Sequence, residues 1–474
     1  MENTDHAGEN SLETRSVGRL IANYAIPCAV SLVINGLYNI VDQIFIGNGV
    51  GYLGNGATNV VFPLTILCVA LGVLFGDGAA TYLSIKLGVG SEKEARAGAV
   101  NGILLSVLAA ILLTGATAIF LRPIVYLFGC TATIEPYALG YGSIVMAGFP
   151  FVLVATTLNS VIRADGSPGW AMVSLVSGAV FNTVMDPVFI FLFHWGVQGA
   201  ALVTILGQMI SFLISVTYLG KWKSIRPGRG DWRLRTRYIR AIVPLGVSSF
   251  INQIATVVMT AVINNMLAIY GARSAYGTDI PLAVMGITLK VNQILIFIVV
   301  GIATGAQPVI GYHYGAGNIG RVMEALRICV LAAIAASAAA FLVFQLAPMS
   351  IVSLFGAESA LYNEFAVKSL RVYLLLCVLN GFQTVASIFV QAIQRPARAI
   401  ALSLSRQIAF LIPAVVLLPR ALGIEGVLWA GPLADALAFF LALAVLASEI
   451  HRLRKMAIEN PREAVARAES QNNP

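Results

Sequence analysis

The chain has 474 residues, of which 58% are hydrophobic and only 11% are charged, against about 25% charged residues in an ordinary soluble domain. Apolar runs of about 20 residues, the length of a helix that crosses a bilayer, recur along the sequence. Because the runs are continuously apolar rather than alternating, they exclude a soluble domain and favour membrane-spanning helices over a β-barrel. The net charge of +8 comes largely from the loops between the runs, so it does not indicate a nucleic-acid partner.

Turn residues and charges divide the sequence into twelve predicted spans. The first half contains spans at about 17–46, 54–85, 97–121, 134–163, 168–194 and 197–220. The second half contains spans at about 239–270, 281–312, 321–347, 360–393, 397–419 and 424–450. We therefore expect an all-α integral membrane protein with twelve transmembrane helices in two six-helix bundles.

The same boundaries predict five segments of the chain. They are a cytoplasmic N-terminal tail (1–16), an N-terminal six-helix lobe (17–220), a basic cytoplasmic linker (221–238), a C-terminal six-helix lobe (239–450) and a cytoplasmic C-terminal tail (451–474). The first 15 residues are acidic rather than basic, which is wrong for a signal peptide, so the first hydrophobic helix is expected to direct insertion.

Positive charge is concentrated on one side of this predicted topology. Between Lys221 and Arg240 the chain carries eight basic residues and a single acid, Asp231. With both termini and the loops after the even-numbered spans placed inside, most of the 30 lysine and arginine residues are cytoplasmic. Only three loop residues of this kind fall outside, namely Arg122, Arg273 and Arg420. The positive-inside rule therefore predicts a multi-pass protein of the plasma membrane with both termini in the cytoplasm.

The two halves of the sequence repeat each other. IVYLFG at 124–129 returns as IVSLFG at 351–356, and GVQG at 196–199 returns as GIEG at 423–426, both at an offset of 227 residues. Ile26-Pro27 likewise corresponds to Val243-Pro244. Since each half has an even number of spans, the two repeats share one orientation, which is an architecture typical of transporters.

Polar side chains occur inside the predicted spans at helical spacing. The first span contains Asn35, Asn39 and Asp42 on one face, and the fifth contains Asn182 and Asp186 one turn apart. Thr204 and Gln208 in the sixth span and Asn159 in the fourth complete the set. Charged groups at this depth are costly, so they indicate a functional site, at which their oxygens could surround a cation or share a proton. The alternative is a hydrogen-bond network that only holds the bundle together.

The second half lacks these groups at the matching positions. Met259 corresponds to Asp42, Pro413 to Asp186, Ala409 to Asn182 and Gly431 to Thr204. A network needed only for packing should persist in both halves, so this loss favours a specialised site in the first. Asp77, Asp435 and Lys290 are also embedded, and the sequence leaves their roles open.

Four segments of the sequence resemble the prokaryotic multidrug and toxic compound extrusion (MATE) family. They are IPCAVSLVINGLYNIVDQIFIG (26–47), SIKLGVG (84–90), NTVMDPVFI (182–190) and GAQPVIGYHYGAG (305–317). The resemblance implies two lobes and export by alternating access, driven by inward cation flow. It also implies that Asp42, Asn182, Asp186 and Thr204 couple the cation, H⁺ or Na⁺, that Asn35 and Asn159 lie near a drug cavity, and that Pro27 bends the first helix.

On the polar pattern, we add Asn39 and Gln208 to the expected substrate cavity. The chain departs from branches of the family that have coupling acids in spans 7 and 10, because span 7 here has Gln253 and no acid. A cation site in the C-terminal lobe is therefore not expected.

The leading hypothesis is a secondary active exporter of amphipathic, cationic organic compounds. Within transport, the alternative is a flippase for lipid-linked precursors, and outside it a receptor or scaffold. The chain has no GxxxxGK[ST] loop, which argues against a primary pump, and Leu74 occupies a glycine position of the GxGD signature of intramembrane aspartyl proteases. We expect no enzyme activity, no cofactor other than the coupling ion and a monomeric protein.

The cysteine and histidine residues predict no further chemistry. The five cysteines show no CxxC spacing, and the four histidines are dispersed, so neither a disulfide framework nor a zinc site is expected. The cysteines are expected to act as small packing residues.

Overall fold

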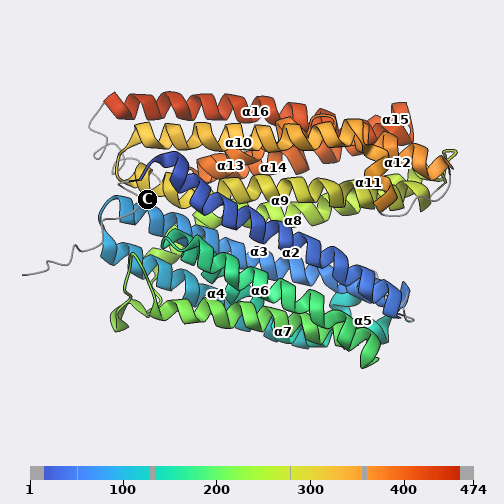
Figure 1. The fold of residues 1–474 in the computed structure, drawn as a ribbon, viewed down its shortest axis with the longest axis horizontal. Coiled ribbons are helices and arrows are strands. Elements are labelled where there is room, and N and C mark those ends of the chain that lie inside the picture. The colour runs from blue at the N-terminus through green and yellow to red at the C-terminus, as the bar shows by residue number, and fades with distance from the viewer. Residues whose placement is uncertain are drawn as a thin grey trace, which may run out of the picture.

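The computed structural model describes residues 15–50, 52–128, 130, 132, 134–277, 279–354 and 360–458. Across these ranges all regular structure is helical, and the helices lie side by side in two bundles (Figure 1). Eleven helices are long and apolar enough to cross a membrane, and a bent pair brings the number to twelve. The predicted all-α membrane fold with twelve spans is confirmed.

Six spans form the N-terminal lobe, the lower bundle in Figure 1. They are α2 (Val17–Val50), α3 (Tyr52–Gly88), α4 (Glu92–Leu127), α5 (Glu135–Ala164), α6 (Pro168–Pro187) with the π-helical turn η1 (Val188–Leu192), and α7 (Gly196–Thr217). The short 3₁₀ helices η2 (Tyr218–Gly220) and η3 (Arg229–Asp231) lie in the connector to the second lobe.

The C-terminal lobe repeats this plan in the upper bundle (Figure 1). Its helices are α8 (Thr236–Gly271), α9 (Asp279–Gly315), α10 (Ile319–Leu346), the short α11 (Pro348–Leu354), α12 (Ala360–Tyr373), α13 (Cys377–Ala392), α14 (Pro396–Leu404), the π-helical turn η4 (Ser405–Leu411), α15 (Ile412–Leu422) and α16 (Ile424–Ile458). The start of α2 and the end of α16 lie at the same end of the molecule, at the left of Figure 1.

Three predicted spans are interrupted in the structure. The tenth is broken between α12 and α13, which are inclined by 46° to each other. The fifth and eleventh contain η1 and η4, each next to a proline, Pro187 and Pro413, whose missing N–H weakens the α-helical ladder. π-helical turns of this kind are frequent at functional sites, and here they interrupt corresponding spans of the two lobes.

The two lobes meet through a pseudo-symmetric set of glycine contacts. A Cβ atom on Gly78 of α3 would meet Ile242 of α8, and one on Gly305 of α9 would meet Ala25 of α2. Gly305 is the repeat counterpart of Gly78, and Ile242 is that of Ala25. The backbones therefore approach at each place closely enough that only glycine fits, and both lobes use the same surface for this contact.

The described glycine contacts between the lobes run from one end of the molecule to about the middle of α2. At that end, Gly88 packs against the backbone of Tyr312, and Gly315 packs in the same way against Ile85. Ser249 Oγ donates to Asp77 across the interface at 2.7 Å, and Gln307 Nε2 donates to Thr81 at 2.7 Å. The innermost glycine contact is that of Gly36 with the ring of Phe297.

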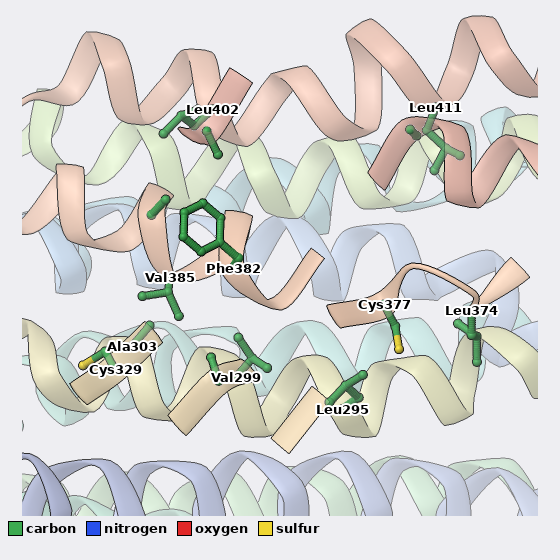
Figure 2. Close-up of a cluster of buried hydrophobic side chains, with 14 of the residues drawn as sticks. Leu295, Val299, Ala303, Cys329, Leu374, Cys377, Phe382, Val385, Leu402 and Leu411 are labelled. Atoms are coloured by element: carbon green, nitrogen blue, oxygen red, sulfur yellow. The ribbon is translucent and has the colours of Figure 1, made fainter. Parts of the chain in front are cut away.

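The hydrophobic core of the C-terminal lobe is formed where α9, α10 and α13 pack together. Figure 2 shows Ala303 of α9 close to Cys329 of α10 and Val385 of α13, with Leu295 of α9 further along, near Cys377 of α13. A second core lies within the N-terminal lobe and includes Leu153 and Phe149 of α5. All five cysteines are buried, as expected of small packing residues.

Asp165, at the end of α5, anchors the connector between the lobes. Its carboxylate accepts hydrogen bonds from the backbone N–H groups of Lys223 at 2.8 Å and Ser224 at 3.0 Å, and from the hydroxyl of Tyr218 at 2.7 Å. Burial raises the pKa of Asp165, while these donors act in the opposite direction. The basic connector is thus fixed against the N-terminal lobe, between Thr217 and Thr236.

Candidate functional site

Two carboxyl groups meet inside the N-terminal lobe. Asp42 projects from the far end of α2, and Asp186 is the penultimate residue of α6. Asp186 is fully buried, Asp42 is half-buried, and the two carboxyl groups lie within hydrogen-bonding reach of each other. The structure therefore brings together the two acids that the sequence predicted to act together.

Asn182 and Thr204 lie beside this acid pair. Asn182, one turn before Asp186 on α6, donates a hydrogen bond from its Nδ2 to Thr204 Oγ1 of α7 at 3.3 Å. The two helices approach closely because a Cβ on Gly207 of α7 would lie only 2.8 Å from the carbonyl oxygen of Gly178 of α6. This glycine contact brings the polar faces of α6 and α7 together one turn away.

The oxygen atoms of the site lack donors. Oδ1 of Asp42, Oδ1 of Asn182 and both carboxylate oxygens of Asp186 are buried and accept no hydrogen bond. No described lysine or arginine forms a salt bridge with either acid. Buried acceptors are nearly always satisfied in proteins, so four such atoms in one place indicate a missing positive partner, either a proton or a cation.

Two tyrosines complete the site and were not predicted from the sequence. Tyr38 and Tyr141 lie close enough to Asp42 and Asp186 to interact with both electrostatically. The Tyr38 hydroxyl is also within reach of the side chain of Gln208. Tyr38 lies one turn before Asp42, a spacing that marks the same face of α2, whereas nothing around Tyr141 in span 4 signals its position.

The other predicted cavity residues lie in different surroundings. Asn39 is exposed and donates from Nδ2 to the backbone carbonyl of Asn35 in its own helix at 2.7 Å. Asn159 is buried and accepts a hydrogen bond from Ser215 Oγ, which also contacts Ser174. Ser174 precedes Asp186 by twelve residues, or about 18 Å along α6. The structure thus places Asn159 in a serine network well away from the acid pair.

Pro27 lies within α2, which is helical on both sides of it. Its carbonyl oxygen accepts a hydrogen bond from Ser31 Oγ at 2.6 Å. Because proline has no N–H, the carbonyl that lacks its helical donor is that of Asn23, one turn earlier, and not that of Pro27.

The three embedded residues whose roles the sequence left open have different environments. Asp77 accepts from Ser160 at 3.0 Å and from Ser249 of the other lobe. Asp435 forms a salt bridge with Arg406. Lys290 is half-buried in the first half of α9.

The arrangement can bind and release a positive charge inside one of two similar helical bundles. Within the described residues, no group of three or more His, Cys, Asp or Glu side chains has the arrangement of a metal site. A Na⁺ ion would therefore need the amide and hydroxyl oxygens of Asn182 and Thr204 besides the two carboxylates. Two six-span bundles related by an internal repeat are typical of membrane transporters.

Comparison with known proteins specifies the family. The MatE family model matches residues 27–188 and 244–416, which is most of both lobes. The chain belongs to the MatE family, and it is a multi-span membrane transporter rather than an enzyme. It is 25% identical over 446 residues to the multidrug export protein MepA of Staphylococcus haemolyticus, covering 93% of this chain and 96% of that protein. It is 24% identical over 446 residues to MepA of Staphylococcus aureus strain N315, covering 92% and 94%.

Solved structures show the same fold. An outward-facing multidrug resistance MATE transporter of the MOP superfamily superposes with a TM-score of 0.88 at 22% identity, covering 94% of this chain and 98% of that one. A MOP superfamily transporter from Pyrococcus furiosus, described as having a binding pocket of reversed polarity, superposes with a TM-score of 0.87 at 21% identity, with the same coverage of 94% and 98%.

Proposed function

We propose that this protein exports amphipathic, cationic organic compounds across the plasma membrane by antiport against H⁺ or Na⁺. The observation that carries the proposal is the set of four buried oxygens of Asp42, Asn182 and Asp186 that have neither a donor nor a basic partner. A coupling ion must bind and leave in each cycle, and these oxygens are acceptors without a partner that such an ion would bind. The similarity to multidrug export proteins supports the substrate class.

The arrangement of the carboxyl groups favours the proton as the coupling ion. Two carboxyls within hydrogen-bonding reach of each other can share one proton, since both cannot be ionised cheaply at that separation. Na⁺ would require about four oxygens at once, and Thr204 Oγ1 is already an acceptor for Asn182. Either ion, moving down a potential of about 100 mV, supplies about 2.3 kcal/mol per charge.

The lobe interface supports alternating access as the transport mechanism. The lobes contact each other at the end that carries Lys86 and the basic connector, which the positive-inside rule assigns to the cytoplasm. The conformation is then closed to the cytoplasm, with the acid pair on the other side of the closure. Opening to the cytoplasm requires the glycine contacts and the Asp77–Ser249 bond to separate while the outer halves of the lobes approach.

The substrate is proposed to bind between the lobes, where Asn35, Asn39 and Gln208 provide a few polar contacts. Asn159 would contact the substrate only where the substrate reaches the inner part of the N-terminal lobe. Mostly apolar cavities with few directional contacts accept many compounds, which suits a broad substrate range. The protein is proposed to act as a monomer, with both termini in the cytoplasm.

Transport into inside-out vesicles tests this function. A fluorescent organic cation is added outside, and proton and Na⁺ gradients are imposed separately. Accumulation that depends on one of the two gradients, and disappears when that gradient is collapsed, is the expected result. Accumulation independent of both gradients would contradict the proposal.

A further inference from the structure

The C-terminal lobe contains a buried ion pair that the proposed function does not use. Arg406 Nε in η4 lies 2.7 Å from Asp435 Oδ1 in α16, and the two side chains are 12% and 3% exposed. Asp435 follows Ile424, the first residue of α16, by eleven residues, which places it about 16 Å from that end of the helix. An ion pair at this depth is costly to desolvate, so its presence calls for a reason beyond stability.

The internal repeat places this pair at the counterpart of the acid site. The offset of 227 residues that relates Gly78 to Gly305 and Gly88 to Gly315 also relates Gln208 to Asp435. Gln208 belongs to the N-terminal site through its contact with Tyr38.

The surroundings of the two sites also correspond. Arg406 lies in η4, in the eleventh span, and Asp186 lies two residues before η1, in the fifth span; by the offset of 227 residues Arg406 corresponds to Ala179, two turns before Asp186 on α6. Tyr373 lies beside both Arg406 and Asp435, as Tyr38 lies beside the two acids of the N-terminal lobe.

The two sites differ in how their charge is balanced. In the N-terminal lobe two carboxyl groups face each other, and three of their oxygens are buried and accept no hydrogen bond. In the C-terminal lobe Asp435 has no buried oxygen of this kind, and Arg406 binds its carboxylate. A guanidinium group stays charged at every physiological pH and is tethered to the chain. The C-terminal site therefore already holds its positive charge and cannot exchange it.

We propose that the Arg406 guanidinium is a built-in cation that occupies, in the C-terminal lobe, the place of the coupling ion in the N-terminal lobe, and that Asp435 is a latent site for a monovalent cation or proton. This inference rests on the proposed antiport function. It explains why a chain with two similar lobes couples transport through one of them. Removing the guanidinium, while keeping Asp435, opens a second exchangeable site.

The test is the number of ions exchanged per substrate, with Arg406→Gln as the variant. In proteoliposomes, the steady-state substrate gradient is measured against the imposed ion gradient on logarithmic axes. The wild-type slope equals the number of coupling ions, and Arg406→Gln is expected to raise it by one. A tenfold ion gradient then supports a substrate gradient ten times larger than in the wild type.

Two control variants separate coupling from a purely structural role. Arg406→Lys keeps the charge and is expected to keep the wild-type slope, as is the double variant Arg406→Gln/Asp435→Asn, which removes the latent acid. An unchanged slope in transport-active Arg406→Gln would overturn the proposal. A wild type with no ion dependence would instead contradict the proposed function itself.

Thermal stability provides a second measurement if Arg406→Gln proves too unstable to transport. With Asp435 unpaired, the melting temperature of the detergent-solubilised variant is expected to rise with increasing proton or Na⁺ concentration. The rise is expected to exceed that of Arg406→Lys and to vanish in the double variant. Equal ion responses in Arg406→Gln and Arg406→Lys would overturn the proposal.

Discussion

In the N-terminal lobe the described buried carboxylates have no basic partner, whereas in the C-terminal lobe each of them is bound by arginine. Asp77, Asp165 and Asp186 belong to the first group, and Asp435 and Glu449 belong to the second. Glu449 alone forms salt bridges with Arg395, Arg398 and Arg452. Two lobes with one backbone plan thus differ in charge balance. The difference supports the proposal that the coupling ion binds in the N-terminal lobe, where the acid pair has no basic partner.

The largest expected effect is on transport. Asp186→Asn keeps the shape of the side chain but cannot exchange a charge, so gradient-driven export is expected to fall to background, as it is for Asp42→Asn. The counterparts in the other lobe serve as controls, because Met259→Leu and Pro413→Ala remove no charge. Vesicle uptake checks the prediction, with membrane expression measured in parallel. Equal losses of gradient-driven export in all four variants would contradict a functional difference between the lobes.

The second effect is on stability, which is expected to fall when an acid of the C-terminal lobe is neutralised but not when Asp186 of the N-terminal lobe is. Glu449→Gln leaves three partly exposed guanidinium groups without the buried carboxylate that they share, and the loss is expected to fall below the about 3–5 kcal/mol of a fully buried pair broken from one side. Asp186→Asn removes an unpaired buried acid and is expected not to lower the melting temperature. Thermal unfolding in detergent measures both variants, and a larger loss for Asp186→Asn would reverse the comparison.

The third effect concerns what the two lobes share. A Cβ on Gly305 would lie 2.5 Å from Cα of Ala25, and Gly78 is equally crowded by Ile242. Gly305→Ala and Gly78→Ala are therefore each expected to destabilise the closed interface by about 1–3 kcal/mol, a typical cost of overpacking. Labelling of cysteines placed in the interface near Gly88 would report the opening. A response in only one variant would show that the interface is not symmetric in function.

The smallest effect is expected for Thr204→Val, provided that the coupling ion is a proton. The substitution removes one oxygen and the acceptor for Asn182 but no titratable group. A proton exporter should lose only a small part of its activity, whereas a Na⁺ exporter should be crippled because an ion ligand is gone. Uptake driven by each gradient in turn distinguishes the two cases.

Much of the fold was predictable because the bilayer imposes the length and apolarity of each span. The acid pair was predictable too, since Asp42 and Asp186 are costly in apolar runs and stand at helical spacing with other polar residues. Tyr141 was not, because tyrosine is common in such helices and its neighbours in span 4 carry no polar pattern. The Arg406–Asp435 pair was missed because the two residues lie on different spans and neither sequence segment signals the other.

The break between α12 and α13 could not be predicted from the sequence either. The segment has no proline or glycine at residues 374–376, so no local signal marks the bend of 46°. The position of Asn159 has a similar cause, because its partner Ser215 lies on α7 and Ser215 in turn bonds Ser174 of α6. Contacts between distant spans decided both features.

The most direct test of the account is the ion flux caused by substrate in proteoliposomes that contain wild-type protein or Asp186→Asn. A proton gradient is imposed, a fluorescent organic cation is added, and the internal pH is followed with a trapped indicator. The account predicts that substrate accelerates the collapse of the gradient in the wild type and has no effect in Asp186→Asn. Equal acceleration by substrate in both proteins would contradict the assignment of coupling to the acid pair.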